Sequence, residues 1–143
     1  MSNPLILSVP FGSDLGDLAY AVRREVFVVE QNVPESLERD KYDPAAVHIV
    51  AIDDGNVVGA LRIVFLPQHA KFGRVAVLQE SRGRGIATAM MKAAMAIAAD
   101  RGETRLYLTS QTDKVPLYEK LGFVAYGDEF EEAGIPHRAM KTY

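Results

Sequence analysis

The sequence predicts a mixed α/β or α+β domain built around one central sheet. β-rich apolar stretches alternate along the chain with stretches of helical spacing, and no internal repeat or low-complexity linker interrupts them. The length of 143 residues matches one compact domain, and the hydrophobic share of 48% supports a sizeable core. We therefore expect residues 1–143 to form a single domain.

The first half of the chain is expected to hold a strand, a helix and a hairpin. Residues 5–9 predict a short opening strand, and residues 11–14 a turn that caps a helix. Apolar residues then recur at helical spacing: Leu15, Leu18, Val22, Val26 and Val29. The helix is expected to end before Pro34, ahead of an acidic, irregular stretch at 35–44. Residues 47–52 and 57–66 predict paired strands, because Asp54-Gly55 between them favours a tight turn.

The second half alternates again. A strand is expected at 72–78, followed by a glycine-rich turn at 81–85 and an Ala- and Met-rich helix that ends near Gly102, at a left-handed cap. Residues 105–109 predict a strand, 114–121 a short helix, 123–126 the start of a strand, and 137–142 a closing segment after a break at 134–136. Arg62 lies among apolar residues of its strand, so it faces either solvent or a cleft.

Composition excludes several classes of site. The formal net charge of −3 provides no broad basic surface, which argues against nucleic acid and anionic lipid as partners. The chain has no cysteine, so disulfides, thiolate metal sites and a Cys nucleophile are excluded. The three histidines are scattered along the chain and do not form the pattern of a metal site, so no metal is expected. Residues 1–10 lack the pattern of a signal peptide, and no apolar run predicts a membrane span, so a cytoplasmic protein is expected.

The glycine-rich turn carries the clearest functional signal. A strand, a glycine-rich turn and a helix present backbone N–H groups and the positive end of the helix dipole, which together bind phosphate. The residues are Arg82, Gly83, Arg84, Gly85, Ile86 and Ala87. A Walker loop is absent, and a dinucleotide fingerprint would need glycine where Thr88 stands. A solvated loop remains the alternative on this motif alone.

Several motifs in one order resemble the GNAT superfamily of N-acetyltransferases. Arg82-x-x-Gly85-x-Ala87 resembles its Arg/Gln-x-x-Gly-x-Gly/Ala signature, and residues 74–77 look like its central strand. Gln111-x6-Tyr118-x3-Gly122-Phe123 is similar to its second motif, with Gln in place of the more usual Asn. Residues 24–34 and 130–137 also resemble the bacterial ElaA/YjcF-like subgroup. The resemblance implies a mixed, mostly antiparallel sheet of six to seven strands, splayed at the cofactor site and flanked by about four helices.

The same resemblance implies an acetyl-CoA site and an acid. The backbone of Val75, Ala76 and Val77 would pair with the pantetheine arm, and residues 82–87 would hold the pyrophosphate. The thioester would lie where the sheet splays, near Val77 and Gln111. Tyr118 matches the family tyrosine thought to protonate the departing thiolate; a half-buried aromatic is the alternative. Gln111 could bond the pantetheine or a helix.

The acceptor side is less specific in sequence. Glu30, Glu38, Asp40 and Asp43 lie in the segment that borders the acceptor site in this family, near His48. Glu30 is the preferred base, and Glu38, Asp40 and His48 are candidate acceptor contacts. The alternative is that residues 38–41 form a solvated surface patch, and that His48 and His137 are structural. The acidic charge favours a small cationic amine over an acidic protein surface.

The sequence is therefore compatible with three functions. The first is an acetyl-CoA-dependent N-acetyltransferase that acts on a small or peptide amine by direct attack in a ternary complex, without a metal. The second is a non-catalytic acyl-CoA sensor, and the third is a scaffold for interactions. Tyr118 argues against the sensor, and the intact 82–87 loop against the scaffold. The resemblance is also compatible with a homodimer.

Overall fold

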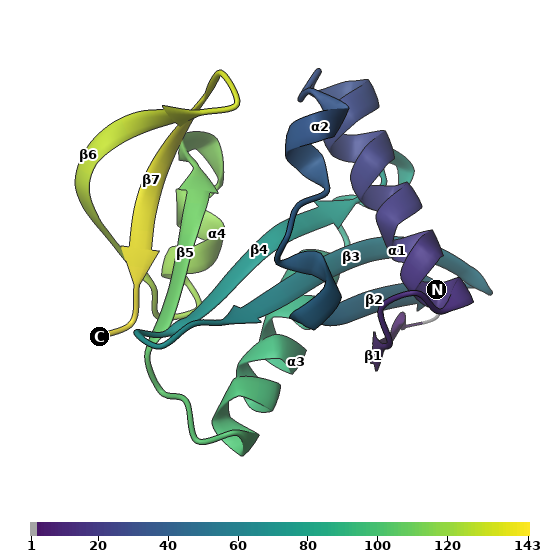
Figure 1. Ribbon diagram of the computed structural model, residues 1–143, viewed down its shortest axis with the longest axis horizontal. Coiled ribbons are helices and arrows are strands. Elements are labelled where there is room, and N and C mark those ends of the chain that lie inside the picture. Colours follow the sequence, from purple (N-terminus) through teal and green to yellow (C-terminus); the bar gives the residue numbers. More distant parts are fainter. Residues whose placement is uncertain (1–2) are drawn as a thin grey trace.

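The structure, a computed structural model, describes residues 3–143 (Figure 1). Met1 and Ser2, which begin the segment expected not to be a signal peptide, lie outside the described residues. The strands are β1 (Leu5–Val9), β2 (Val47–Asp53), β3 (Asn56–Phe65), β4 (Ala70–Val77), β5 (Leu106–Gln111), β6 (Val124–Glu132) and β7 (Ile135–Lys141). The α-helices are α1 (Asp14–Arg23), α2 (Glu35–Glu38), α3 (Ile86–Asp100) and α4 (Val115–Glu119).

All seven strands form one sheet in the order β1-β2-β3-β4-β5-β7-β6. Five of the neighbouring pairs are antiparallel, and only β4 and β5 run parallel. The parallel pairing covers just Ala70–Phe72 against Leu106–Leu108. Beyond these residues β4 and β5 diverge, so the sheet is splayed in its middle (Figure 1). The predicted fold class, including the mostly antiparallel sheet and about four flanking helices, is confirmed.

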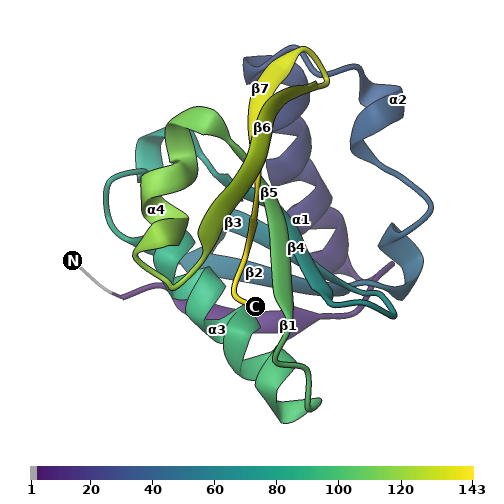
Figure 2. The same ribbon diagram turned by 90° about the vertical axis from the view of Figure 1, so that its left-hand side faces the viewer.

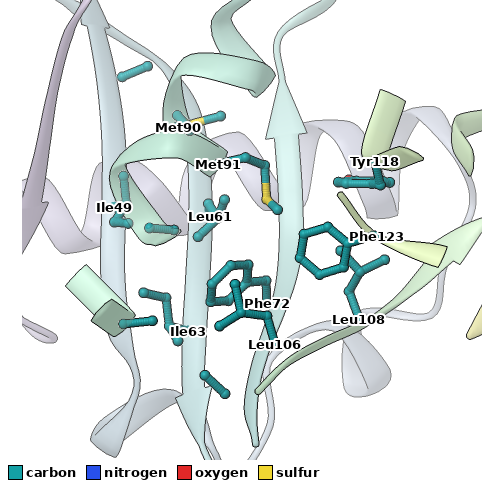
Figure 3. Close-up of a cluster of buried hydrophobic side chains, with 14 of the residues drawn as sticks. Ile49, Leu61, Ile63, Phe72, Met90, Met91, Leu106, Leu108, Tyr118 and Phe123 are labelled. Atoms are coloured by element: carbon teal, nitrogen blue, oxygen red, sulfur yellow. The ribbon is translucent and has the colours of Figure 1, made fainter. Parts of the chain in front are cut away.

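Helices cover both faces of the sheet. Helices α3 and α4 lie on one face and α1 on the other, as Figure 2 shows. The larger core joins α3 and α4 to the sheet through residues such as Leu61, Phe72, Met90 and Phe123, which are at most 1% exposed (Figure 3). The smaller core packs Ala19, Val22 and Val26 against the opposite face.

Local turn chemistry places the elements where the sequence predicted them. Ser13 caps α1 by accepting a hydrogen bond from the Gly16 N–H. Asp54 and Gly55 both adopt positive φ, 51° and 79°, as a tight hairpin turn requires. Gly102 follows α3 with φ of 78°, the expected left-handed cap.

The segment after α1 differs from the prediction in two ways. The helix continues to Glu30, but residues Arg24–Glu30 form a π-helix, whose wider turn shifts the apolar face. Val29 in this segment is 52% exposed although it fits the helical spacing. The acidic stretch at 35–44 is not simply irregular, since it contains α2 and a 3₁₀ turn at Asp43–Ala45.

Two features are absent from the described residues 3–143. None of the helices there combines the length and apolar character needed to cross a membrane. The same residues contain no group of three His, Cys, Asp or Glu side chains arranged to hold a metal ion.

Candidate active site

A cavity of about 850 Å³ opens where β4 and β5 diverge. Its wall includes the unpaired edge of β4, the end of β5 and the loop before α3. Helix α4, the π-helix, α2 and the turn between β6 and β7 complete it. Ligand pockets in proteins are commonly of this size.

The edge of β4 is turned toward the cavity by a bulge. The pairing of β3 with β4 shifts between Ala60 and Arg62, and Arg74 in the bulge has φ of 52°. The Arg74 side chain holds this conformation by donating hydrogen bonds to the carbonyl oxygens of Leu37 (3.2 Å) and Glu38 (3.0 Å). Beyond the bulge, Val75, Ala76 and Val77 line the cavity and have no pairing to β5. They present the strand edge that an extended ligand arm can join.

The glycine-rich loop ends at the start of α3. Gly83 and Gly85 have φ of 80° and 78°, a conformation that side chains rarely adopt, which explains both glycines. Gly85 is the N-cap of this 15-residue helix, and no side chain caps it. Its first N–H groups are therefore available to a ligand, and Gly83, Gly85, Ile86 and Ala87 all line the cavity. This is an anion-binding geometry.

The two arginines of the loop are held by carboxylates. Arg82 donates from Nε to the Val77 carbonyl (2.9 Å) and from both Nη atoms to Glu30 (2.7 Å each). These bonds lower the pKa of Glu30, so its carboxylate is a weaker base than usual. Arg84 points back to Asp53, 2.6 Å away. The structure thus brings Glu30 to the cavity as a partner of Arg82 in the glycine-rich loop.

Tyr118 borders the cavity from α4. Its side chain is 7% exposed and packs edge-on against Phe123, at 6.4 Å between ring centroids (Figure 3). Gly122, with φ of 97°, reverses the chain so that the Phe123 N–H bonds the Tyr118 carbonyl at 3.2 Å. Burial raises the pKa of Tyr118 to about 12. The phenol is therefore protonated at neutral pH and can donate a hydrogen bond into the cavity.

Gln111 bonds a helix, one of the two roles considered for it. Its side-chain amide donates to Gln31 Oε1 at 2.8 Å, which ties the end of β5 to the end of the π-helix. Both residues line the cavity.

The acidic segment is largely neutralised. Arg23 bonds Glu38 (2.6 Å) and Asp43 (2.8 Å), and Arg62 bonds Asp40 (2.6 Å) and Asp43 (2.9 Å). Burial alone would raise the pKa of Asp43, but these arginines hold it well below its usual range. Arg74 lies 3.2 Å from Asp40 and joins the same cluster.

Two expectations about this segment are therefore corrected. The solvated-patch alternative is wrong for Glu38, which is 1% exposed. The segment also offers little free negative charge to a cationic acceptor. Three arginines face Glu38, Asp40 and Asp43, and the exposed Glu35 pairs with Arg24. Glu38 Oε2 is nevertheless buried without a hydrogen-bond partner among the described residues. Glu38 and Asp40 both line the cavity, and so does Arg62, which faces the cleft.

The structure separates the two histidines that were considered. His48 does not line the cavity; it contacts the Asp43 carbonyl through Nε2 at 2.8 Å on the far side of the ion cluster. His137 does line the cavity. The geometry thus gives no support to His48 as an acceptor contact.

Sequence reasoning missed the ion cluster and Gln31. A signal for the cluster was present: Arg62 stands within a Val- and Ile-rich strand, where a buried guanidinium needs a carboxylate, and the segment at 35–43 is dense in carboxylates. Which carboxylate pairs with which arginine depends on the fold. Gln31 carries no comparable signal.

Comparisons with known proteins agree with this geometry. Residues 13–143 match the family model described as the acetyltransferase (GNAT) domain. Over 123 residues the chain is 42% identical to YjcF of Bacillus subtilis (strain 168), described as an uncharacterized N-acetyltransferase, covering 85% of this chain and 88% of that one. An acyl-CoA N-acyltransferase from Pseudomonas aeruginosa superposes with a TM-score of 0.85 at 28% identity, covering 98% and 99% of the two chains. Escherichia coli ElaA superposes with a TM-score of 0.87 at 25% identity, covering 97% and 99%.

Proposed function

The chain belongs to the GNAT acetyltransferase family of acyl-CoA-dependent acyltransferases, and from this premise we propose that it moves the acetyl group of acetyl-CoA onto a primary amine. One observation carries the proposal most directly. A single cavity joins the uncapped, glycine-flanked start of α3, the open edge of β4 and the protonated phenol of Tyr118. These three features match a pyrophosphate, a pantetheine arm and a departing thiolate in turn.

The phosphate loop and β4 would hold the cosubstrate. The pyrophosphate would accept hydrogen bonds from the N–H groups of residues 83–87, where the helix dipole adds favourable charge. No Cβ atom at Gly83 or Gly85 stands between backbone and phosphate. The pantetheine amides would pair with the backbone of Val75–Val77 as an added strand.

The reaction needs no protein nucleophile. The neutral amine attacks the thioester carbonyl, the C–N bond forms and the C–S bond breaks. An alkylammonium acceptor thus yields an amide, coenzyme A and one released proton. The chain contains no cysteine that could carry an acyl intermediate, which favours direct attack in a ternary complex.

Tyr118 would assist the departing sulfur. Its pKa of about 12 lies above the ~8.5 of an ordinary thiol, so full transfer of its proton to a thiolate is uphill. A hydrogen bond from the phenol, strengthening as negative charge builds on sulfur, is the better fit to this difference. Such a group typically contributes about 10²–10⁴-fold.

The acceptor would approach from the face that carries α1 and α2. Glu38 and Asp40 line the cavity there, and Glu38 Oε2 keeps acceptor capacity for an amine N–H. Because arginines balance these carboxylates, we propose an amine acceptor on the family's chemistry rather than on surface charge.

The proposal is tested by coenzyme A release from acetyl-CoA, followed with a thiol reagent across a panel of amines and peptides. The chain itself contributes no thiol background. Amine-dependent release would support the proposal. Tight acetyl-CoA binding, measured by calorimetry, with no release on any amine would favour an acyl-CoA sensor.

A further inference from the structure

A histidine faces the cavity from the opposite side of the sheet to Tyr118. His137 on β7 is the register partner of Gln111 on β5, and cross-strand partners extend from the same face. Gln111 reaches toward the π-helix that follows α1, whereas Tyr118 packs with the core under α3 and α4. His137 thus borders the cavity on the face that carries α1 and α2, where the acceptor would approach. Tyr118 borders it on the opposite face, where the departing sulfur would lie.

The His137 ring is held by a backbone contact through Nδ1, which leaves Nε2 as the basic nitrogen. Its Nδ1 lies 2.7 Å from the Ile135 carbonyl oxygen, which can only accept a hydrogen bond. Nδ1 must therefore carry the proton, and in the neutral ring Nε2 holds the lone pair. The Phe130 ring stacks on the imidazole at 6.1 Å between centroids. The side chain is 10% exposed, so this orientation is well constrained.

A partly exposed carboxylate lies next to Nε2 and is in contact with solvent. Glu132 Oε2 lies 3.5 Å from His137 Nε2, and its side chain is 49% exposed. Thr109 Oγ1 lies at 3.5 Å from the same oxygen. Asp113 and Lys114 lie on the 3₁₀ turn that packs against β7, and both line the cavity. Glu132 is therefore placed next to His137 Nε2 and also reaches solvent.

We propose that His137 is the general base of the reaction and that Glu132 conducts the proton from it to water. This assignment rests on the proposed acetyl transfer. The acceptor ammonium first gives one proton to His137 Nε2, and the freed lone pair forms the C–N bond to the acetyl carbon. As the C–S bond breaks, its electrons leave with the sulfur, which accepts a hydrogen bond from Tyr118, and the second proton of the attacking nitrogen goes to the sulfur. Glu132 then relays the proton to solvent, which restores the neutral imidazole. Glu30, whose carboxylate is engaged by Arg82, keeps the phosphate loop in place instead.

The test compares two acceptors that differ in basicity. Benzylamine is protonated at neutral pH and must lose a proton before it attacks. O-methylhydroxylamine is already neutral, and its attack product is acidic enough to lose a proton to water. For His137→Gln we expect kcat/KM with benzylamine to fall by about 100-fold or more. With O-methylhydroxylamine we expect a loss of only several-fold, and added imidazole should restore part of the benzylamine rate.

Two further variants keep the test decisive. His48→Gln is the matched control, because His48 is equally buried at 6% exposed and contacts a backbone carbonyl, but lies outside the cavity. It should retain the wild-type ratio between the two amines. Glu132→Gln leaves the histidine in place and should lose rate mainly with benzylamine, which covers the case in which His137→Gln does not fold.

The outcomes separate this inference from the proposed function. A selective loss with benzylamine, at unchanged acetyl-CoA affinity, would support His137 as the base. Unchanged rates, or equal losses with both amines in His137→Gln and Glu132→Gln, would overturn it while leaving the acetyl transfer intact. Wild-type protein that binds acetyl-CoA but transfers to no amine would overturn the proposed function and this assignment with it.

Discussion

Replacing Tyr118 with phenylalanine removes one hydroxyl from the cavity and little else. The ring is 7% exposed and packs against Phe123, and Phe retains that packing. No hydrogen bond to the Tyr118 hydroxyl is present within residues 3–143, so its loss leaves no buried partner unpaired. We therefore expect the free energy of unfolding to change by less than about 1 kcal/mol.

The same change should lower the rate of acetyl transfer strongly. A positioned acid or hydrogen-bond donor contributes about 10²–10⁴-fold, which corresponds to about 3–5 kcal/mol of transition-state stabilisation. We expect kcat to fall by that factor in Tyr118→Phe, with acetyl-CoA affinity within about twofold of wild type. Steady-state coenzyme A release gives kcat, and calorimetry gives the affinity. Turnover at the wild-type rate would refute the role of Tyr118.

The pH dependence of this role follows from the direction of the pKa shift. Because burial raises the pKa of Tyr118 to about 12, the phenol keeps its proton between pH 10, where an ordinary tyrosine ionises, and pH 12. The folded state is stabilised by this group below pH 10, and that contribution is lost as the pH rises toward 12. A rate that falls with an apparent pKa near 10, and does so only when Tyr118 is present, would contradict the assignment.

The remaining predictions concern the phosphate loop and the ion cluster. Gly85→Asp should weaken acetyl-CoA binding by about 100-fold or more in a calorimetric titration, through strained backbone and charge repulsion, and an unchanged affinity would place the pyrophosphate elsewhere. Asp43→Asn should cost about 3–5 kcal/mol in urea unfolding, because it removes the buried carboxylate that Arg23 and Arg62 share, with the exposed Glu119→Gln as control. Because the pKa of Asp43 is lowered, its stabilisation should begin to decline near pH 4 and be lost progressively at lower pH, and acid titration of the Asp43→Asn variant should lack that component. Glu30→Gln should raise the Kd for acetyl-CoA with little effect on the rate at saturation, whereas a large fall in kcat alone would restore Glu30 as the base.

Features set by local chemistry were predictable from the sequence. The hairpin at Asp54-Gly55, the cap at Gly102 and the start of α3 at Gly85 each depend on a few adjacent residues whose conformational preferences are known. The similarity of residues 111–123 to the second GNAT motif also singled out Tyr118, which the structure places on the cavity wall. Gly122 explains that motif physically, because its positive φ folds Phe123 back onto the tyrosine.

Features set by contacts between distant residues were not predictable in the same way. Glu38, Asp40 and Asp43 pair with arginines 15–34 positions away, so most of the apparent surface charge of the acidic segment is neutralised on folding. Glu30 meets Arg82 across 52 positions and Gln111 meets Gln31 across 80. The π-helix at 24–30 departs from the 3.6-residue period of an α-helix, and no glycine or proline within it indicates this departure in the sequence.

The most direct test of the central claim follows the acetyl group itself. The protein is incubated with acetyl-CoA labelled with carbon-13 in the acetyl group and with the amine panel, and small molecules and intact protein are analysed by mass spectrometry. The account predicts label in an N-acetylated amine, stoichiometric with coenzyme A, and none on the protein when amine is left out. Label fixed on the protein, or coenzyme A formed with acetate as the sole labelled product, would contradict direct transfer to an amine.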